Sequence, residues 1–368
     1  MDISRRTFLK IGAAAAAAPL AHPAPARAAK IATRILGRTG LAVSELGMGV
    51  MITPNPEVVR AALDAGVTYF DTARAYMGGQ NEAILGAGLG ARRKDVVVAT
   101  KCLRFESVAS IAASCEQSLA ALATDWIDVF QLHALTSRTQ VLAPESLEGI
   151  AALKRAGKIR FAGVTTHAGM VEVIDAAIEA GVYDTVLTTF NFREPPGLGD
   201  AVRRAAAAGV GVIAMKIMAG GYRDAAAPAL NPFQGALRWV LRQPGVSTTI
   251  PSLASFEQLK ENLEAATTSY GVRDALALEL YAAAIESRHC LACGGCAGQC
   301  PNGADVPTIV RALMYHEGYG QPALARETLA AALFPCATCA DCTVVCRAKV
   351  SVPERVAAAV RLAGAAHA

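Results

Sequence analysis

Charge is scarce in this 368-residue sequence, since Asp, Glu, Lys and Arg make up 18% of it and aromatic residues only 5%. The formal net charge of +4 comes mostly from residues 1–28, which hold Arg5, Arg6, Lys10 and Arg27 against Asp2. The rest of the chain has 31 basic and 30 acidic residues. We therefore expect no nucleic-acid-binding surface. Because 53% of the residues are hydrophobic, the chain is predicted to be globular.

The sequence also lacks an apolar run long enough to form a stable membrane span. The stretch from Ile11 to Ala21 is shorter than the roughly 20 residues that a bilayer requires. It follows Arg5-Arg6 and precedes the small-residue sites "APA" and "ARA", and this layout resembles a twin-arginine signal. We predict that residues 1–28 direct folded protein through the twin-arginine machinery to the periplasm. An N-terminal membrane anchor is the alternative.

No glycine-rich dinucleotide fingerprint follows the first apolar strand pattern, which argues against a doubly wound sheet. Short β-branched runs instead alternate with longer helical patterns, several of which end in Gly. Eight strands are expected at residues 46–50, 67–71, 95–101, 127–133, 159–165, 183–190, 211–216 and 247–251. Eight strands in strict alternation with helices predict an α/β fold, a (β/α)8 TIM barrel.

Four ionisable side chains fall at successive strand ends of this predicted barrel. Asp71 ends the second strand, Tyr76 follows it, Lys101 ends the third and His133 ends the fourth. TIM barrels carry their chemistry on this rim, so we expect a proton-transfer site there. Lys101 would lower the pKa of Tyr76, Asp71 would orient the lysine, and His133 would donate a hydrogen bond to a substrate oxygen. Unrelated polar rim residues are the alternative.

Residues 33–266 resemble the aldo/keto reductases. The motifs that carry the resemblance are "LGRTGLAVSELGMG", "ALDAGVTYFDTARAYMGGQNEAILGAGL", "VVVATK", "IDVFQLH", "LKRAGKIRFAGVT" and "IPSLASFEQLKENL". The resemblance implies a leading hairpin at residues 33–44. It also implies that Asp71, Tyr76, Lys101 and His133 are a catalytic tetrad in which Tyr76 protonates a carbonyl that accepts hydride from a nicotinamide.

The same resemblance implies positions that contact NADH or NADPH. Thr165 and Thr166 stand where the family has Ser-Asn at the nicotinamide amide, Leu187 replaces a glutamine, and Met215 replaces a stacking aromatic residue. Lys216 would supply a charge to the pyrophosphate. The implied adenine-side residues are Ser252, Gln258, Glu261 and Asn262. Because the amide, stacking and phosphate contacts differ from the family pattern, we expect weak nicotinamide binding and no clear preference for NADP.

Eight of the ten cysteines form two runs with the spacing C-x2-C-x2-C-x3-C, and the second run repeats the first 46 residues later. This spacing predicts two 4Fe-4S clusters, in which the fourth cysteine of a run commonly ligates the other cluster. Zinc and disulfides are the alternatives. Cys102 and Cys115 fall in barrel elements and are expected to be core thiols. The ligand set is Cys290, Cys293, Cys296, Cys300, Cys336, Cys339, Cys342 and Cys346.

Helical patterns between the two runs resemble the helical two-cluster ferredoxins. We therefore divide the chain into an export signal at 1–28, an aldo/keto reductase barrel at 29–270 and a small, mainly helical 4Fe-4S domain at 271–368.

A cluster passes one electron and a hydride carries two, and no flavin motif is visible to join them. The first interpretation is an enzyme that reduces a small carbonyl or oxidises an alcohol while its clusters exchange electrons with a redox partner protein. In the second, the same enzyme has structural clusters. In the third, the barrel is a docking scaffold of an electron-transfer subunit.

Overall fold

The computed structural model describes residues 30–227, 229–339 and 341–364, so the predicted signal at residues 1–28 lies outside the described residues. From Ile31 onward the chain forms one compact unit. Among the helices described, none is both long and apolar enough to cross a membrane.

A single sheet of eight parallel strands dominates the structure, in the order β10-β9-β8-β7-β6-β5-β4-β3. Parallel bridges from Leu46 to Thr249 and from Gly49 to Ser252 join its two edges, so the sheet is a nearly closed barrel. This confirms the predicted TIM barrel. The strands are β3 (Met48–Gly49), β4 (Tyr69–Asp71), β5 (Val97–Cys102), β6 (Ile127–Leu132), β7 (Ile159–Thr166), β8 (Thr185–Thr189), β9 (Gly211–Met215) and β10 (Val246–Thr249).

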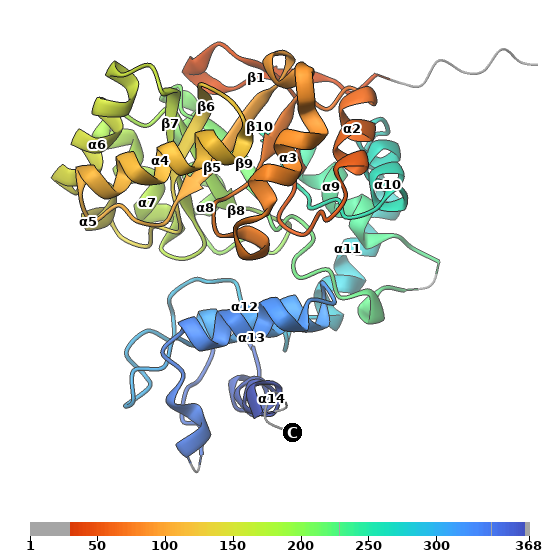
Figure 1. The fold of residues 1–368 in the computed structure, drawn as a ribbon. Coiled ribbons are helices and arrows are strands. Elements are labelled where there is room, and N and C mark those ends of the chain that lie inside the picture. Colours follow the sequence, from red (N-terminus) through yellow and green to blue (C-terminus); the bar gives the residue numbers. More distant parts are fainter. Residues whose placement is uncertain (1–29, 228, 340, 365–368) are drawn as a thin grey trace, which may run out of the picture. The chain divides into compact units, whose positions relative to one another are not determined.

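Helices alternate with the strands and surround the sheet (Figure 1). Side-chain caps begin several of them, because the first amides of a helix have no partner within it. Asn55 accepts from the Glu57 amide, and Ser107 accepts from the Ser110 amide. The helices of the barrel are α2 (Pro56–Asp64), α3 (Asn81–Leu89), α4 (Val108–Leu122), α5 (Arg138–Val141), α6 (Pro144–Arg155), α7 (Met170–Ala180), α8 (Leu198–Ala207), α9 (Pro232–Leu241) and α10 (Phe256–Ala266).

A hairpin precedes the barrel and closes its amino-terminal end. Strands β1 (Thr33–Ile35) and β2 (Ala42–Ser44) pair in antiparallel fashion, as the resemblance implied. The turn helix η1 (Gly37–Thr39) follows Leu36, which is fully buried beside the barrel interior. A Cβ on Gly211, the first residue of β9, would lie 2.7 Å from Leu36 Cδ1. Because the hairpin packs against the start of β9, the carboxyl ends of the strands remain available for a site.

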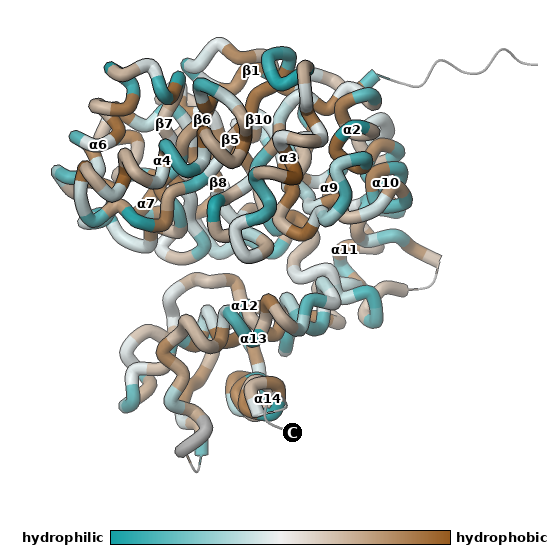
Figure 2. Tube along the Cα trace, viewed as in Figure 1, coloured by the Kyte–Doolittle hydropathy of each residue, from teal (hydrophilic) through white to brown (hydrophobic). Residues whose placement is uncertain are grey.

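Apolar residues are concentrated in the strands and on the inner faces of the helices, whereas the outer faces are more polar (Figure 2). The main core lies between the sheet and its helices, and a smaller core fills the barrel interior. Cys102 and Cys115 belong to the main core and are fully buried.

The chain after the barrel is helical among the residues described. It contains α11 (Val272–Ala284), α12 (Val306–Glu317), α13 (Pro322–Ala331) and α14 (Val352–Gly364). Asp274 of α11 pairs with Arg238 of α9 at 2.6 Å, so α11 is tied to the barrel. Helices α12 to α14 share a core with Tyr222 and Phe233, which follow β9. The division of the chain at residue 271 stays a prediction.

Short 3-10 helices complete the described secondary structure. They are η2 (Tyr76–Gly79), η3 (Gly90–Asp95), η4 (Arg223–Ala225) and η5 (Pro335–Thr338).

Candidate functional site

A cavity of about 850 Å³ opens at the carboxyl ends of the strands. This volume lies toward the upper end of the range for ligand sites in proteins. Its walls come from loops that follow several strands and from α12 of the C-terminal segment. The predicted site residues that line it are Asp71, Tyr76, His133, Met215, Lys216, Ser252, Gln258, Glu261 and Asn262. Lys101, Thr165 and Thr166 lie behind the wall rather than in it.

A buried ion pair lies beneath the cavity. Lys101 Nζ donates to Asp71 Oδ1 and, at 2.6 Å, to the carbonyl oxygen of Thr72. Gln131 Nε2 donates to the other Asp71 oxygen at 3.1 Å. Asp71 and Lys101 are each 2% exposed. Burial raises the pKa of Asp71 and lowers that of Lys101, and pairing each with the other offsets the cost of burying its charge.

Tyr76 stands over this pair. Lys101 Nζ lies 4.9 Å from the centre of the Tyr76 ring. The rings of His133 and Tyr76 pack edge to face, with their centroids 6.1 Å apart. We expected the lysine to bring the pKa of Tyr76 below its ordinary value, and the net direction is the opposite. Burial, then Asp71 and Tyr315, raise that pKa well above 10. The lysine's hydrogen bonds go to Asp71 and Thr72, and Tyr76 keeps its proton in the physiological pH range.

Two histidines line the same end of the cavity. Burial, then Lys101, Lys216 and Arg311, lower the pKa of His133 to about 3. The pKa of His167 is also well below its usual range, for the same principal reason of burial. The two rings are 6.4 Å apart, and neither Nδ1 has a hydrogen-bond partner among the residues described. Both rings are therefore neutral near pH 7 and have hydrogen-bonding capacity for a ligand.

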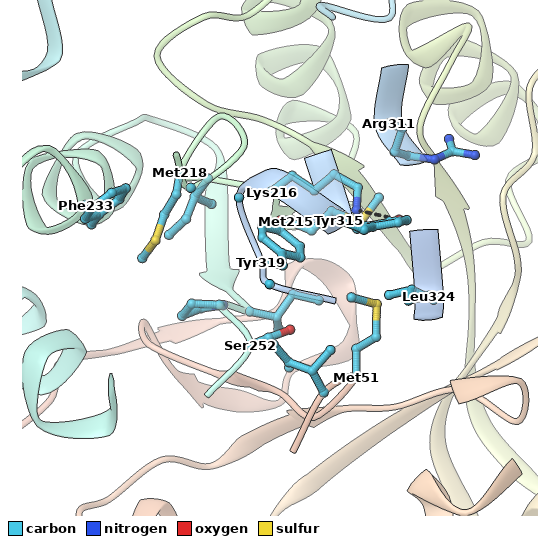
Figure 3. A pocket seen from close by; sticks show the side chains of 18 of the residues that line it. Met51, Met215, Lys216, Met218, Phe233, Ser252, Arg311, Tyr315, Tyr319 and Leu324 are labelled. Carbon is cyan, nitrogen blue, oxygen red and sulfur yellow. Dashed lines mark hydrogen bonds between the residues drawn. The ribbon is translucent and has the colours of Figure 1, made fainter. Parts of the chain in front are cut away.

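The C-terminal segment contributes residues that sequence reasoning missed. Arg311 and Tyr315 reach the cavity from one face of α12, four residues apart (Figure 3). Tyr315, which is 7% exposed, accepts a hydrogen bond from Lys216 Nζ at 3.3 Å. Although burial opposes it, Lys216 and Arg311 lower the pKa of Tyr315. The i, i+4 spacing was visible in the sequence, but nothing there indicated that this helix covers the barrel.

The hydroxyls expected at the nicotinamide amide are engaged elsewhere. Thr165 and Thr166 are fully buried. Thr165 Oγ1 accepts from the Ala134 amide at 2.8 Å, and Thr166 Oγ1 donates to the Ala168 carbonyl at 2.8 Å. Met215, 8% exposed, does line the cavity. Side-chain contacts to a carboxamide are therefore weak at this end.

The opposite end of the cavity holds the predicted adenine-side residues. Gln258 Oε1 accepts from the Ala254 amide at 2.8 Å, and Glu261 accepts from Asn231 Nδ2 at 2.8 Å. Asn262 Nδ2 donates to the Gln258 carbonyl at 2.8 Å. Its buried Oδ1 has no partner in the described residues. An unpaired buried acceptor costs free energy unless a ligand donates to it, so a heterocyclic amine fits here.

The cysteines form two neighbourhoods that each draw on both runs. Cys290, Cys293, Cys296 and Cys346 make up thiol group A, and Cys300, Cys336, Cys339 and Cys342 make up thiol group B. Burial, then Cys296, Cys346 and Cys293, raise the pKa of Cys290 to about 12. Burial, then Cys339, Cys300 and Cys342, raise the pKa of Cys336. Within the described ranges, however, no three Cys, His, Asp or Glu side chains are arranged to hold a metal ion.

A second, small cavity of about 40 Å³ lies between thiol group A and the main cavity. Cys290 and His289 line one part of it. His167, Lys216 and Arg311 line both this cavity and the large one. Side chains that line both cavities therefore lie between Cys290 of thiol group A and the candidate active site.

Comparison with known sequences identifies two regions. The model of the aldo/keto reductase family matches residues 55–234, and that of the twin-arginine translocation signal matches residues 2–22. An uncharacterized oxidoreductase of Mycobacterium bovis is 30% identical over 263 residues, which are 60% of this chain and 80% of that protein. An L-galactose dehydrogenase of Arabidopsis thaliana is 28% identical over 65% of this chain and 89% of that protein.

A solved structure supports the fold. The holo form of an aldo-keto reductase from Bacillus halodurans superposes with a TM-score of 0.61. It is 24% identical, and the match covers 72% of this chain and 98% of that one. At this identity the likeness concerns the barrel fold alone.

The half-buried, neutral histidines predict a specific acid sensitivity. Unfolded His133, with an ordinary pKa near 6.5, takes up a proton below that pH, whereas folded His133 does so only near pH 3. The unfolded state binds more protons in this window, so the free energy of unfolding falls as the pH decreases from 6.5 to 5. The contribution is at most about 1.4 kcal/mol per pH unit.

Denaturant unfolding followed by tryptophan fluorescence measures this effect, because both tryptophans, Trp126 and Trp239, lie in the barrel. His133→Asn should lose stability less steeply than the natural protein on acidification, and the two should have similar pH dependence above pH 7. Parallel slopes between pH 6.5 and 5 would contradict the assigned pKa.

Proposed function

Because the chain belongs to the aldo/keto reductase family, we propose that it is an exported oxidoreductase that reduces a carbonyl group or oxidises the corresponding alcohol. One observation carries the proposal: Asp71, Tyr76 and His133 meet at one end of a large cavity, and Lys101 lies directly behind them. They come from the ends of three neighbouring strands. Few arrangements other than a proton-transfer site bring such groups together.

Tyr76 is the proposed general acid. The hydroxyl is protonated over the whole physiological range and donates its proton as negative charge develops on a carbonyl oxygen, and its raised pKa makes this transfer depend on stabilisation of the tyrosinate. Lys101, under the ring, stabilises the tyrosinate that remains, and Asp71 keeps the lysine in place. His133, neutral at that pH, donates a hydrogen bond to the same oxygen. In the oxidation direction the same groups accept the proton.

The hydride donor that this family generally uses is NADH or NADPH. When bound, it supplies a hydride to the carbonyl carbon. The cavity could hold it with the Asn262 oxygen toward the adenine and Met215 against the nicotinamide. The engaged hydroxyls of Thr165 and Thr166 support weak retention of the carboxamide. We infer that the dinucleotide binds weakly and that electrons also reach the protein by another route.

That route is the pair of 4Fe-4S clusters proposed for the eight cysteines. When bound, the clusters would supply single electrons, so this route also requires a mediator in the cavity that accepts electrons one at a time and delivers them as a pair to the carbonyl carbon. Support comes from the thiol groups, since the first three cysteines of each run neighbour the fourth cysteine of the other, as in two-cluster ferredoxins. Cys293 is exposed, so a redox partner protein could approach thiol group A. The twin-arginine signal supports export, and we propose the periplasm as the destination.

A second role for the clusters has its own support. Thiol groups A and B pack around a small core of six buried valines. A core of this size contributes little stability, and metal binding commonly supplies what such a segment lacks. In this version the clusters are structural and a nicotinamide alone supplies the electrons. The third interpretation, a barrel that serves only as a docking scaffold, is not favoured, because it leaves the gathering of the four tetrad residues without a role.

Removing the Tyr76 hydroxyl tests the chemistry. Tyr76→Phe should lower carbonyl turnover by about 10²- to 10⁴-fold, because only the proton donor is lost. Tyr270→Phe is the matched control, since that ring packs on Arg242 away from the cavity. Steady-state kinetics with aromatic aldehydes and circular dichroism of both variants supply the measurements. Unchanged turnover in Tyr76→Phe would show that the family mechanism is not used.

The thiol groups make a prediction about paired substitutions. Protein purified without oxygen should contain about eight irons per chain. Cys290→Ser with Cys346→Ser removes two ligands from one group, so one cluster with an unaltered electron paramagnetic resonance spectrum should remain. Cys290→Ser with Cys300→Ser stays within one run but changes both groups, so neither cluster signal should survive unaltered. The reverse pattern, or zinc in place of iron, would refute the grouping.

Measuring nicotinamide binding distinguishes electron supply through the clusters from electron supply by NADH or NADPH alone. Titration with NADH and NADPH should give dissociation constants weaker than the low micromolar range, with little difference between the two dinucleotides. Dithionite-reduced protein that retains the bound mediator should nevertheless turn over a carbonyl substrate without either dinucleotide. Low-micromolar binding accompanied by rapid turnover with exchanging nicotinamide would instead favour structural clusters.

A further inference from the structure

The cations that line the large cavity divide into paired and unpaired ones. Arg223 pairs with Glu261 at 3.6 Å, and Arg288 pairs with Asp224 at 2.7 Å and with Glu317 at 3.2 Å. Lys101, behind the wall, pairs with Asp71. In contrast, Lys216 and Arg311 have no carboxylate within ion-pairing distance in the part of the chain that the structure describes.

Lys216 is aimed at the cavity by an unusual backbone conformation. Its φ of +54° lies in the left-handed region, which side-chain-bearing residues rarely adopt and which costs free energy. Asn191 Nδ2 donates to the Lys216 carbonyl at 3.1 Å and holds this conformation. The ammonium group then reaches the Tyr315 hydroxyl rather than the adenine end of the cavity (Figure 3). We had expected Lys216 to face a pyrophosphate, and its side chain points instead toward the tetrad end.

Arg311 adds a second charge at the same end from α12. Its one hydrogen-bond partner among the described side chains is Thr308, at 3.0 Å. The positive charges of Arg311 and Lys216 each contribute to lowering the pKa of His133, of His167 and of Tyr315. These three side chains all line the cavity. Two half-buried cations therefore surround the space in front of His133 without a protein anion to balance them, which is costly unless a ligand supplies one.

We propose that Lys216 and Arg311 bind a carboxylate on the substrate, so that the natural substrate is an oxo acid rather than a neutral aldehyde or ketone. This inference rests on the proposed carbonyl chemistry, because it assigns the group next to the reacting carbonyl. Arg311 offers a planar pair of donors that matches a carboxylate, and Lys216 offers a point charge beside it. Tyr315 donates a third hydrogen bond when protonated. The site exists only with α12 in position, so the C-terminal segment selects the substrate.

Binding of an unreactive probe tests this without catalysis. Isothermal titration calorimetry compares benzoate with its neutral counterpart benzamide on the full-length holoprotein. Benzoate should bind the natural protein at least tenfold more tightly than benzamide. Arg311→Gln and Lys216→Met should each weaken benzoate binding at least tenfold and leave benzamide unchanged. Arg326→Gln, on the neighbouring helix α13, is the control that should leave both affinities unchanged.

Several outcomes would overturn the assignment. Equal affinity for benzoate and benzamide, or insensitivity of benzoate to both substitutions, would do so. If the substitutions weaken inorganic phosphate or NADPH but not benzoate, the two cations serve a phosphate and the carboxylate proposal is wrong.

Tyr76→Phe separates this inference from the proposed function, because it should retain benzoate binding while losing turnover. Turnover that is unaffected in Tyr76→Phe, together with intact benzoate selectivity, would reject the mechanism but keep the subsite. Arg311→Lys should recover part of the benzoate affinity, which a variant that fails for reasons of folding would not do.

Discussion

The buried pair of Lys101 and Asp71 is the constraint on which the candidate site depends. A lysine and an aspartate that are both 2% exposed can stay charged only if each compensates the other. The barrel supplies that geometry because β4 and β5 are neighbours, and the Thr72 carbonyl and Gln131 amide satisfy the remaining polar atoms. The lysine is therefore fixed beneath Tyr76 by the pairing of the two strands whose ends carry Asp71 and Lys101.

The C-terminal segment forms part of the cavity at the barrel mouth and contributes charged side chains of both signs to it. Helix α12 brings Tyr315 and Arg311 to the cavity at the strand ends. Tyr315 contributes to the raised pKa of Tyr76 and Arg311 to the lowered pKa of His133, in each case after burial. The same segment carries both thiol groups. Residues that follow the barrel thus contribute to the electrostatics of the candidate site, which cannot be understood from the barrel residues alone.

The sequence allowed the barrel, its eight strands and the gathering of Asp71, Tyr76 and His133 to be predicted, because strand periodicity and strand-end position are local properties. It did not reveal that α12 lines the cavity at the barrel mouth, because the apolar pattern of an amphipathic helix does not specify which surface the helix packs against. For that reason Arg311, Tyr315 and the direction of the Tyr76 pKa shift were missed. The engagement of Thr165 and Thr166 was equally hidden, because hydroxyl orientation depends on contacts such as that with the Ala134 amide.

The exchange of fourth cysteines between the two runs also orders events in time. Thiol group B is complete only when Cys342 has been synthesised, and thiol group A only when Cys346 has. The twin-arginine signal at residues 2–22 is translated before both. If the two thiol groups hold the proposed clusters, export in the folded state requires that Cys346 has already been synthesised. The proposed exchange of cysteine ligands between the two runs would thus make folding of residues 290–346 a condition for export directed by the signal at residues 2–22.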